Sequence, residues 1–308
     1  MARTPRTRLT PLGRALLGGT AVVLALGLVT TVVVVSLRGD GPPAPAACRA
    51  TVDGTTVQLS PEQMGNAATI AGIAGRRGLP ARAATIGIAT AMQESKLVNV
   101  SYGDRDSLGL FQQRPSQGWG TKKQVTDPVY ATNAFYDVLV KVEGYRSLPI
   151  TTAAQRVQRS AFPQAYAQHE EEARVLASAL SGYSTAALTC TLDATRAPAG
   201  ARGLHALRTA LQHEQARTAQ APLPKRAGLR LTPATSGADS AAVRRDAWSV
   251  AQWAVGQAER LGIARVYVDG QVWRRASPDD GWSAARGAGV PTSGSRDVVV
   301  MLEDADPA

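Results

Sequence analysis

The sequence AMQES at residues 91–95, followed by SLGLFQQ at residues 107–113, is the part of this chain that indicates most about its fold and chemistry. The first stretch closes a run of small and apolar residues with helical spacing, so we expect a helix that ends at Glu94. A carboxylate there faces the negative end of the helix dipole, and Met92 and Leu97 would shield it from water. Both effects favour the protonated acid, which is the form that a general acid needs at neutral pH. Glu94 is therefore the first candidate for a catalytic residue.

A glycine-led run, Gly109 to Gln112, begins fifteen residues after Glu94. This arrangement resembles the Glu-Ser … Gly-Leu-Met-Gln signature of soluble lytic transglycosylases, and goose-type lysozymes are similar in this region. The resemblance covers residues 60–182, which is under half of the chain. It implies membership of the lysozyme-like superfamily, whose fold is a mainly α domain with a small β-hairpin insert after the helix that carries the acid.

The resemblance also implies a role for each matching residue. Glu94 would protonate the glycosidic oxygen and then act as a base, with Ser95 beside it. Backbone and amide groups of one cleft wall would hold the sugars, and the residues that match this wall are Gly109, Leu110, Phe111 and Gln112. The adjacent Gln113 is a further candidate for binding sugar amides. The transglycosylases carry an Ala-Tyr-Asn motif on a later helix, which this chain lacks, and the nearest equivalent is Tyr166 in an Ala-Tyr-Ala sequence. The missing motif argues against catalytic activity, but it does not argue against the fold.

Two further acids and one tryptophan are candidates for the same cleft. Glycosidases usually pair two carboxyl groups, so Asp104 or Asp106 facing Glu94 would allow hydrolysis. With neither in place, a lone glutamate still supports lytic transglycosylation, because the substrate's own hydroxyl attacks the anomeric carbon. The alternative is turn chemistry within residues 103–107, and we retain Asp104 as a substrate-binding candidate. Trp119 lies between two glycines and is either a sugar-stacking platform or a loop-packing residue.

Three other runs are similar to a family of exported actinobacterial proteins, some of which carry the label "heavy metal transporter": residues 91–106, 112–120 and 160–163. The residues give that label no support. One membrane helix forms no ion pathway, and three histidines with two distant cysteines form no ligand cluster of ordinary spacing. We therefore predict no metal site and no cofactor.

The N-terminal region predicts a membrane anchor. Residues 15–37 carry no charge, and this run is long enough to cross a bilayer as a helix. Arginines and no acids precede it, so the positive-inside rule places the N-terminus in the cytoplasm and everything after Arg38 outside. The alternative is a signal peptide cleaved near residues 44–46, but the apolar run exceeds a usual signal-peptide core. We expect a single-pass cell-membrane protein whose bulk is extracellular.

The two cysteines, Cys48 and Cys190, most simply form one disulfide in an exported chain. This bond would bracket every motif above and so mark the ends of a domain. We expect six segments: a cytoplasmic basic tail (1–14), the transmembrane helix as a signal anchor (15–37), a tether (38–47), the lysozyme-like domain (48–192), a linker (193–240) and a small α+β domain of unknown role (241–308).

The formal net charge of +10 indicates either an ordinary arginine-rich surface or attraction to an anionic polymer such as the cell wall. No cluster of Lys and Arg interleaved with aromatic residues occurs, so we predict no nucleic-acid partner. The expected partners are peptidoglycan strands, the cytoplasmic membrane through the N-terminal helix, and an envelope protein through residues 241–308.

Together these features predict a glycosidase or lytic transglycosylase that cleaves the β-1,4 bond between N-acetylmuramic acid and N-acetylglucosamine, with Glu94 as its single catalytic acid. The alternative is a non-catalytic peptidoglycan-binding or envelope scaffold protein, which the missing Ala-Tyr-Asn motif favours. A further alternative is a surface protein whose cleft binds another glycan.

Overall fold

Helix α2 (Pro61–Arg76) begins at a sequence that is typical of a helix start: a serine, then a proline, with a glutamine three residues after the serine. Ser60 is its N-cap: the Ser60 side chain accepts a hydrogen bond from the Gln63 N–H, and the Gln63 side chain accepts one from the Ser60 N–H. Helix α3 (Ala81–Ser95) follows after a short turn and ends at the predicted position. The predicted end of α3 is confirmed, because helical periodicity is a local signal that neighbouring residues determine.

The computed structural model describes residues 45–159, 164–193, 197–215, 218–224, 226–234, 239–275, 281–287 and 290–303. The chain divides into two units, Met1–Ala44 and Pro45–Ala308, and all described residues belong to the second. Its other helices are α4 (Lys122–Val125), α5 (Pro128–Leu139), α6 (Ile150–Gln158), α7 (Glu170–Leu180), α8 (Gly200–Glu214), α9 (Ser240–Gly256) and α10 (Ala258–Leu261), with 3-10 turns η1 (Pro115–Gln117) and η2 (Ala167–His169).

The strands of the described residues form two antiparallel sheets. The first has the order β2-β1-β3 and consists of β1 (Ala47–Val52), β2 (Thr55–Leu59) and β3 (Leu188–Thr191). The second has the order β4-β5-β9-β6-β7-β8 and consists of β4 (Thr218–Pro222), β5 (Gly228–Pro233), β6 (Ile263–Val268), β7 (Gln271–Arg274), β8 (Trp282–Ala284) and β9 (Val298–Leu302). An Asp269-Gly270 turn joins β6 to β7, and both of its residues have positive φ, as such hairpins require.

The expectation of a mainly α lysozyme-like domain with a small β-hairpin insert is wrong, because the described part of the chain is a mixed α/β structure with two antiparallel sheets. The region of the expected insert holds one antiparallel bridge, between Leu108 and Gln113, instead of paired strands. The sequence gives no signal for β3, β4 or β5. These strands are short. Strands β3 and β5 pair with strands that are distant in the sequence, and β4 is an edge strand that pairs with β5 alone.

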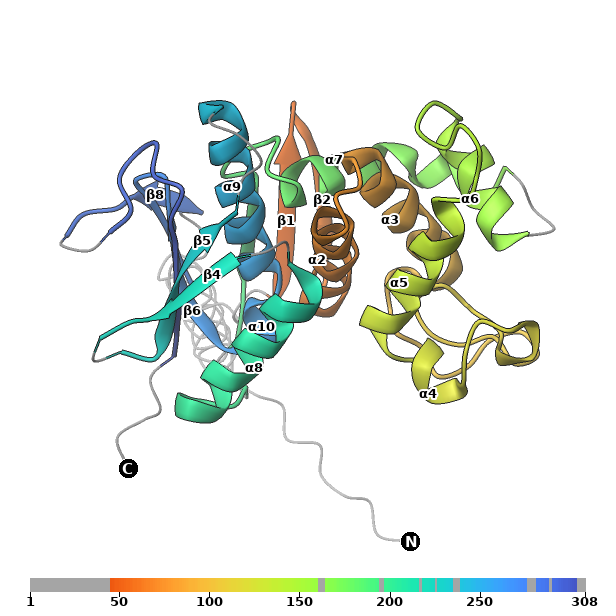
Figure 1. Ribbon diagram of the computed structural model, residues 1–308, viewed down its shortest axis with the longest axis horizontal. Coiled ribbons are helices and arrows are strands. Elements are labelled where there is room, and N and C mark those ends of the chain that lie inside the picture. Colours follow the sequence, from red (N-terminus) through yellow and green to blue (C-terminus); the bar gives the residue numbers. More distant parts are fainter. Residues whose placement is uncertain are drawn as a thin grey trace, which may run out of the picture. The chain divides into compact units, whose positions relative to one another are not determined.

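Helix α9 lies between the second sheet and helix α2 (Figure 1). It contacts β5, β6 and β9 of that sheet, and it also contacts α2, α7 and β3. Trp248 and Trp253 of α9 are fully buried in this layer. Residues 241–308, expected as a separate small domain, therefore share one hydrophobic core with residues 48–192. The expected linker, residues 193–240, contains α8, β4 and β5.

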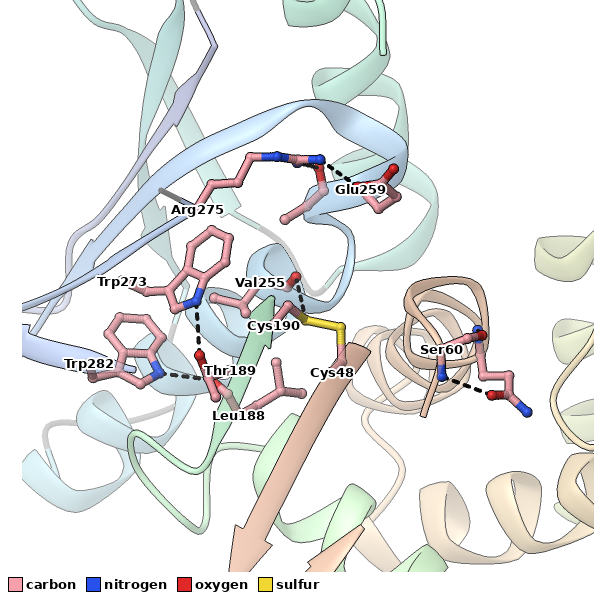
Figure 2. The surroundings of a disulfide bond; sticks show 12 residues. Cys48, Ser60, Leu188, Thr189, Cys190, Val255, Glu259, Trp273, Arg275 and Trp282 are labelled. Atoms are coloured by element: carbon pink, nitrogen blue, oxygen red, sulfur yellow. Dashed lines mark hydrogen bonds and ion pairs between the residues drawn. A yellow bond between two sulfur atoms is a disulfide. The ribbon is translucent and has the colours of Figure 1, made fainter. Parts of the chain in front are cut away.

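Cys48 and Cys190 form the predicted disulfide, and they face each other at paired positions of β1 and β3. Figure 2 shows that the C-terminal sheet contacts the same strand: the Trp273 indole N–H of β7 donates a hydrogen bond to the Thr189 hydroxyl of β3 over 3.2 Å. The disulfide therefore joins β1 to a strand that is also held by the C-terminal part of the chain.

Among the described residues, none of the helices has the length and apolar character needed to cross a membrane. The predicted membrane helix at residues 15–37, the basic tail and most of the tether lie outside the described residues. The prediction of an anchor thus rests on the sequence.

Candidate active site

The C-terminal end of α3 places Glu94 in a partly buried position. The chain leaves this helix through two consecutive left-handed residues, Lys96 (φ 56°) and Leu97 (φ 60°). Side chains of α2 hold both: the Gln63 amide donates to the Lys96 carbonyl (2.7 Å), and the Asn66 amide donates to the Leu97 carbonyl (2.8 Å). Because left-handed backbone is unfavourable for residues other than glycine, these bonds fix the turn that follows the acid.

The Tyr166 hydroxyl donates a hydrogen bond to Glu94 Oε1 over 2.7 Å. Tyr166 is fully buried and directly precedes η2, so the packing around its ring holds the hydroxyl in place. A hydroxyl in this position orients the carboxyl group. The structure thus brings together two residues that the sequence indicates separately.

Gln93, the residue before the acid, contacts the same segment. Its side-chain oxygen accepts a hydrogen bond from the Gln168 amide (2.9 Å) and lies 3.2 Å from His169 Nε2. Burial lowers the pKa of His169, and the nearby Glu172 carboxylate opposes this shift. A neutral His169 with its proton on Nε2 donates to Gln93. Residues 166–169 therefore hold the last turn of α3 at two adjacent positions.

A tight turn at residues 108–113 lies against the end of α3. The Ser95 hydroxyl donates to the Leu110 carbonyl over 2.8 Å. The Gln158 amide, at the end of α6, donates to the Phe111 carbonyl over 2.8 Å. Two consecutive carbonyls of the turn are thus fixed by two different helices, one of which carries the candidate acid.

Most of the predicted cleft wall is part of the hydrophobic core. Leu110 and Phe111 are fully buried, and the Phe111 ring stacks on Phe135 with the ring centroids 4.7 Å apart. Gly109 has a φ of 75°, and a Cβ there would lie 2.1 Å from the Val125 carbonyl, so only glycine allows the turn to approach α4 this closely. In this structure these three residues fix the turn beside the acid.

The two glutamines predicted to hold sugar amides are both engaged with the protein. Gln113 is buried, and its amide donates to the Ala131 carbonyl over 3.0 Å. Gln112 is partly exposed, and its amide nitrogen lies 3.3 Å from the carbonyl oxygens of Tyr102 and Gly109. Gln112 therefore connects the preceding loop to the turn.

Asp104 and Asp106 occupy different environments. The Asp104 side chain is 91% exposed and lies 3.9 Å from the Nε of the exposed Arg105. Asp106 accepts hydrogen bonds from the Ser116 N–H, the Arg114 side chain and the Ser116 hydroxyl, and these bonds hold the pKa of Asp106 well below its usual range. Within the described residues, neither carboxylate forms a hydrogen bond with the candidate acid. Asp106 thus organises the loop in which it lies.

Trp119 is partly buried and packs against the hydrophobic core. Its neighbour Gly120 packs closely against Tyr130: a Cβ at Gly120 would lie only 2.8 Å from the Tyr130 hydroxyl. This placement agrees with the loop-packing alternative for Trp119.

Sequence reasoning missed the site contacts of three side chains: those of Gln63, Asn66 and Gln158. Each reaches its partner across a separation of 31 to 47 positions in the chain. The capping motif marks Gln63, but only for its role at the start of α2. No local pattern reports which distant carbonyl an amide will meet.

A cavity of about 410 Å³, whose lining does not include Glu94, is formed by α2, the start of α5, and residues of α8 to α10. The buried Glu214 lines it and accepts hydrogen bonds from Thr69, Trp253 and Gln257 at one oxygen and from Arg260 at the other. Because these bonds satisfy the carboxylate, Glu214 is a structural junction between helices. Among the described residues, no group of three or more His, Cys, Asp or Glu side chains is placed to hold a metal ion.

Comparison with known proteins provides no relative: no protein-family model matches the chain, and no curated protein matches it. The spacing of the sequence motifs and the geometry around Glu94 are therefore the features of this chain that indicate a function.

Proposed function

We propose that this protein cleaves the glycan strands of peptidoglycan, with Glu94 as its single catalytic acid. The observation that carries the proposal is the 2.7 Å hydrogen bond from the buried Tyr166 hydroxyl to Glu94 Oε1. This bond holds one carboxyl oxygen, and among the described residues no hydrogen bond engages the other, which can meet a glycosidic oxygen. The resemblance of Glu94-Ser95 and Gly109–Gln112 to the lytic transglycosylase signature supports the same assignment.

The proposed reaction needs one acid that works in both directions. Glu94 in its protonated form gives a proton to the oxygen of the β-1,4 bond between N-acetylmuramic acid and N-acetylglucosamine, and the bond from that oxygen to the anomeric carbon breaks. The Glu94 carboxylate then takes a proton from the hydroxyl that attacks the anomeric carbon. Between these steps, the hydrogen bond from Tyr166 stabilises the charged carboxylate.

The surroundings of Asp104 and Asp106 favour attack by the substrate's own hydroxyl. Hydrolytic glycosidases use a second carboxyl group across the cleft from the acid. Asp106 is bonded within its own loop, and Asp104 extends into solvent. We therefore propose lytic transglycosylation, which leaves anhydro ends, as the outcome. The predicted membrane anchor would keep this activity at the outer face of the cytoplasmic membrane.

The test is mass spectrometry of the products from purified cell wall. The full-length protein in detergent is the right sample, because residues 241–308 share a hydrophobic core with residues 48–192. We expect the wild type to release muropeptides with anhydro ends and Glu94→Gln to release none. Glu143→Gln, which changes an exposed glutamate after α5, is the matched control and should retain wild-type activity.

Each other outcome has a distinct meaning. Equal product release by Glu94→Gln and the wild type would show that the assignment of the acid is wrong. Products with reducing ends would show that the reaction is hydrolysis and not transglycosylation. Binding to insoluble peptidoglycan without any soluble product would select a wall-binding scaffold instead of an enzyme.

A further inference from the structure

Two exposed cations, Lys96 and Arg159, flank the turn at residues 108–113. Each directly follows a residue whose side chain bonds that turn: Ser95 precedes Lys96, and Gln158 precedes Arg159. Because the two bonded carbonyls are consecutive in the turn, the residues that precede the two cations contact the same short segment. Lys96 also directly follows the helix end that carries the candidate acid.

Both cations occupy helix C-caps with left-handed backbone, at φ 56° for Lys96 and φ 51° for Arg159. Helix ends of this kind usually carry glycine or asparagine, which adopt the left-handed conformation more readily. A lysine and an arginine are therefore poor choices for the backbone at these positions. Compared with glycine or asparagine, each of these two residues adds a positive charge on a long side chain.

Among the described residues, neither cation has a neighbour that neutralises its charge. In the part of the chain that the structure describes, no carboxylate oxygen lies within ion-pair distance of Lys96 or Arg159. Other arginines of the same region are paired, as in the contacts of Arg77 with Asp137 and of Arg114 with an aspartate. The two charges at the turn are thus available to a ligand.

We propose that Lys96 and Arg159 bind the carboxylate groups of the glycan strand and so select acidic peptidoglycan over neutral amino-sugar polymers. Peptidoglycan strands carry carboxylates on their lactyl groups and on the peptides attached to them, whereas chitin-type oligomers carry none. A strand that is cleaved at Glu94 passes along the turn and brings these groups to the two cations. This inference rests on the proposed function and names the feature of the substrate that is recognised.

Binding measurements on the Glu94→Gln background test the inference without turnover. The probes are peptide-bearing strands, strands stripped of their peptides, and neutral chitooligosaccharides. The variant is Lys96→Asn with Arg159→Asn, because asparagine removes each charge and suits left-handed backbone. Arg202→Ala, which removes an exposed arginine of α8, is the matched control. The exchange of Lys96→Arg with Arg159→Lys keeps both charges and should bind like the parent.

We expect affinity for peptide-bearing strands to fall about threefold for each cation removed at low salt, as for other exposed charge contacts. The difference should disappear at high ionic strength, because salt screens exposed charges. A loss that persists on stripped strands assigns the contact to the lactyl carboxylates, and a loss confined to peptide-bearing strands assigns it to the peptides; both support the inference.

Unchanged affinity in the asparagine variant, or an equal loss on neutral chitooligosaccharides, would overturn the proposed carboxylate contact. This binding test can succeed or fail independently of the proposed catalytic role of Glu94. If Glu94→Gln still releases product while the asparagine variant binds acidic strands more weakly, the binding role of the cations stands and the catalytic assignment fails.

Discussion

The Tyr166 hydroxyl lies 2.7 Å from Glu94 Oε1, although the two residues are 72 positions apart in the chain. The contact depends on the close packing of α3 against α7, since Tyr166 lies just before the η2 turn that leads into α7. Because the tyrosine is fully buried, the core of the protein sets the orientation of the carboxyl group.

Tyr166→Phe should lower kcat for glycan cleavage by about 10- to 100-fold, because a hydrogen bond to a charged group contributes about 1.5–3 kcal/mol. Tyr136→Phe is the matched control: Tyr136 is also fully buried, and its hydroxyl donates to the Ile70 carbonyl over 3.0 Å. Both variants should lose similar stability in thermal unfolding, but only Tyr166→Phe should lose turnover. An equal fall in kcat for both would mean that the hydroxyl acts through stability alone.

Ser95→Ala should lower both stability and kcat/KM. The Ser95 hydroxyl fixes the Leu110 carbonyl, and a buried carbonyl left without its donor costs about 1–3 kcal/mol. Ser249→Ala removes the same kind of bond elsewhere, from a serine hydroxyl to the Leu180 carbonyl (2.8 Å). Urea denaturation should show comparable losses for the two variants. If Ser249→Ala also reduces kcat/KM, the turn beside Glu94 has no special role in positioning.

The parts of the fold that the sequence predicts correctly are those that local chemistry specifies. The Ser60 capping box and the Asp269-Gly270 hairpin each involve residues within a few positions of one another. The strand β4 has the sequence TAQAP, which contains no large apolar residue, and it forms because β5 pairs with it. The region around it was therefore predicted as a linker, since pairing partners are not visible in a single segment.

In the candidate site, too, some features are predictable from the sequence and others depend on distant parts of the chain. Motif spacing indicates Glu94, and the tyrosine of an Ala-Tyr-Ala sequence indicates Tyr166, because both are single residues with a chemical role. Leu110 and Phe111 match the motif too, but the structure buries their side chains in the core. A sequence match cannot separate a residue that touches a ligand from one that supports the residue that does. The amide of Gln158 illustrates the opposite case, since it holds the turn without belonging to any motif.

His169→Gln should flatten the dependence of stability on pH. Burial lowers the pKa of His169 in the folded protein, while in the unfolded chain it is about 6.5. Above that value His169 is neutral in both states; as the pH falls below it, the unfolded chain gains the proton first, so the free energy of unfolding decreases. The substituted glutamine cannot titrate, and its amide can still donate to Gln93. Denaturation at pH 8 and pH 5 should show a larger loss for the wild type, and equal losses would contradict the prediction.

Glu214→Ala should destabilise the protein by about 3 kcal/mol, because it leaves several buried donors without an acceptor. Glu62→Ala is the control in the same cavity; Glu62 is exposed in the first turn of α2, so its loss should cost less than about 1 kcal/mol. Urea denaturation measures both. Since Glu214 connects α8 to α2 and α10, the wild type should unfold in one transition, and two separate transitions would show that residues 193–308 fold independently.

Replacing both Cys48 and Cys190 by serine should lower the free energy of unfolding by about 4–5 kcal/mol in the chain-entropy model, because the bond closes a loop of 142 residues. The effect acts mainly on the unfolded chain. In the folded protein, β1 and β3 remain paired by backbone hydrogen bonds, and Trp273 still contacts Thr189. Activity per folded molecule at 25 °C should therefore be retained while the denaturation midpoint falls. An unchanged midpoint would show that the unfolded chain is already held compact, and a loss of activity at full folding would show that the disulfide positions the Glu94 site directly.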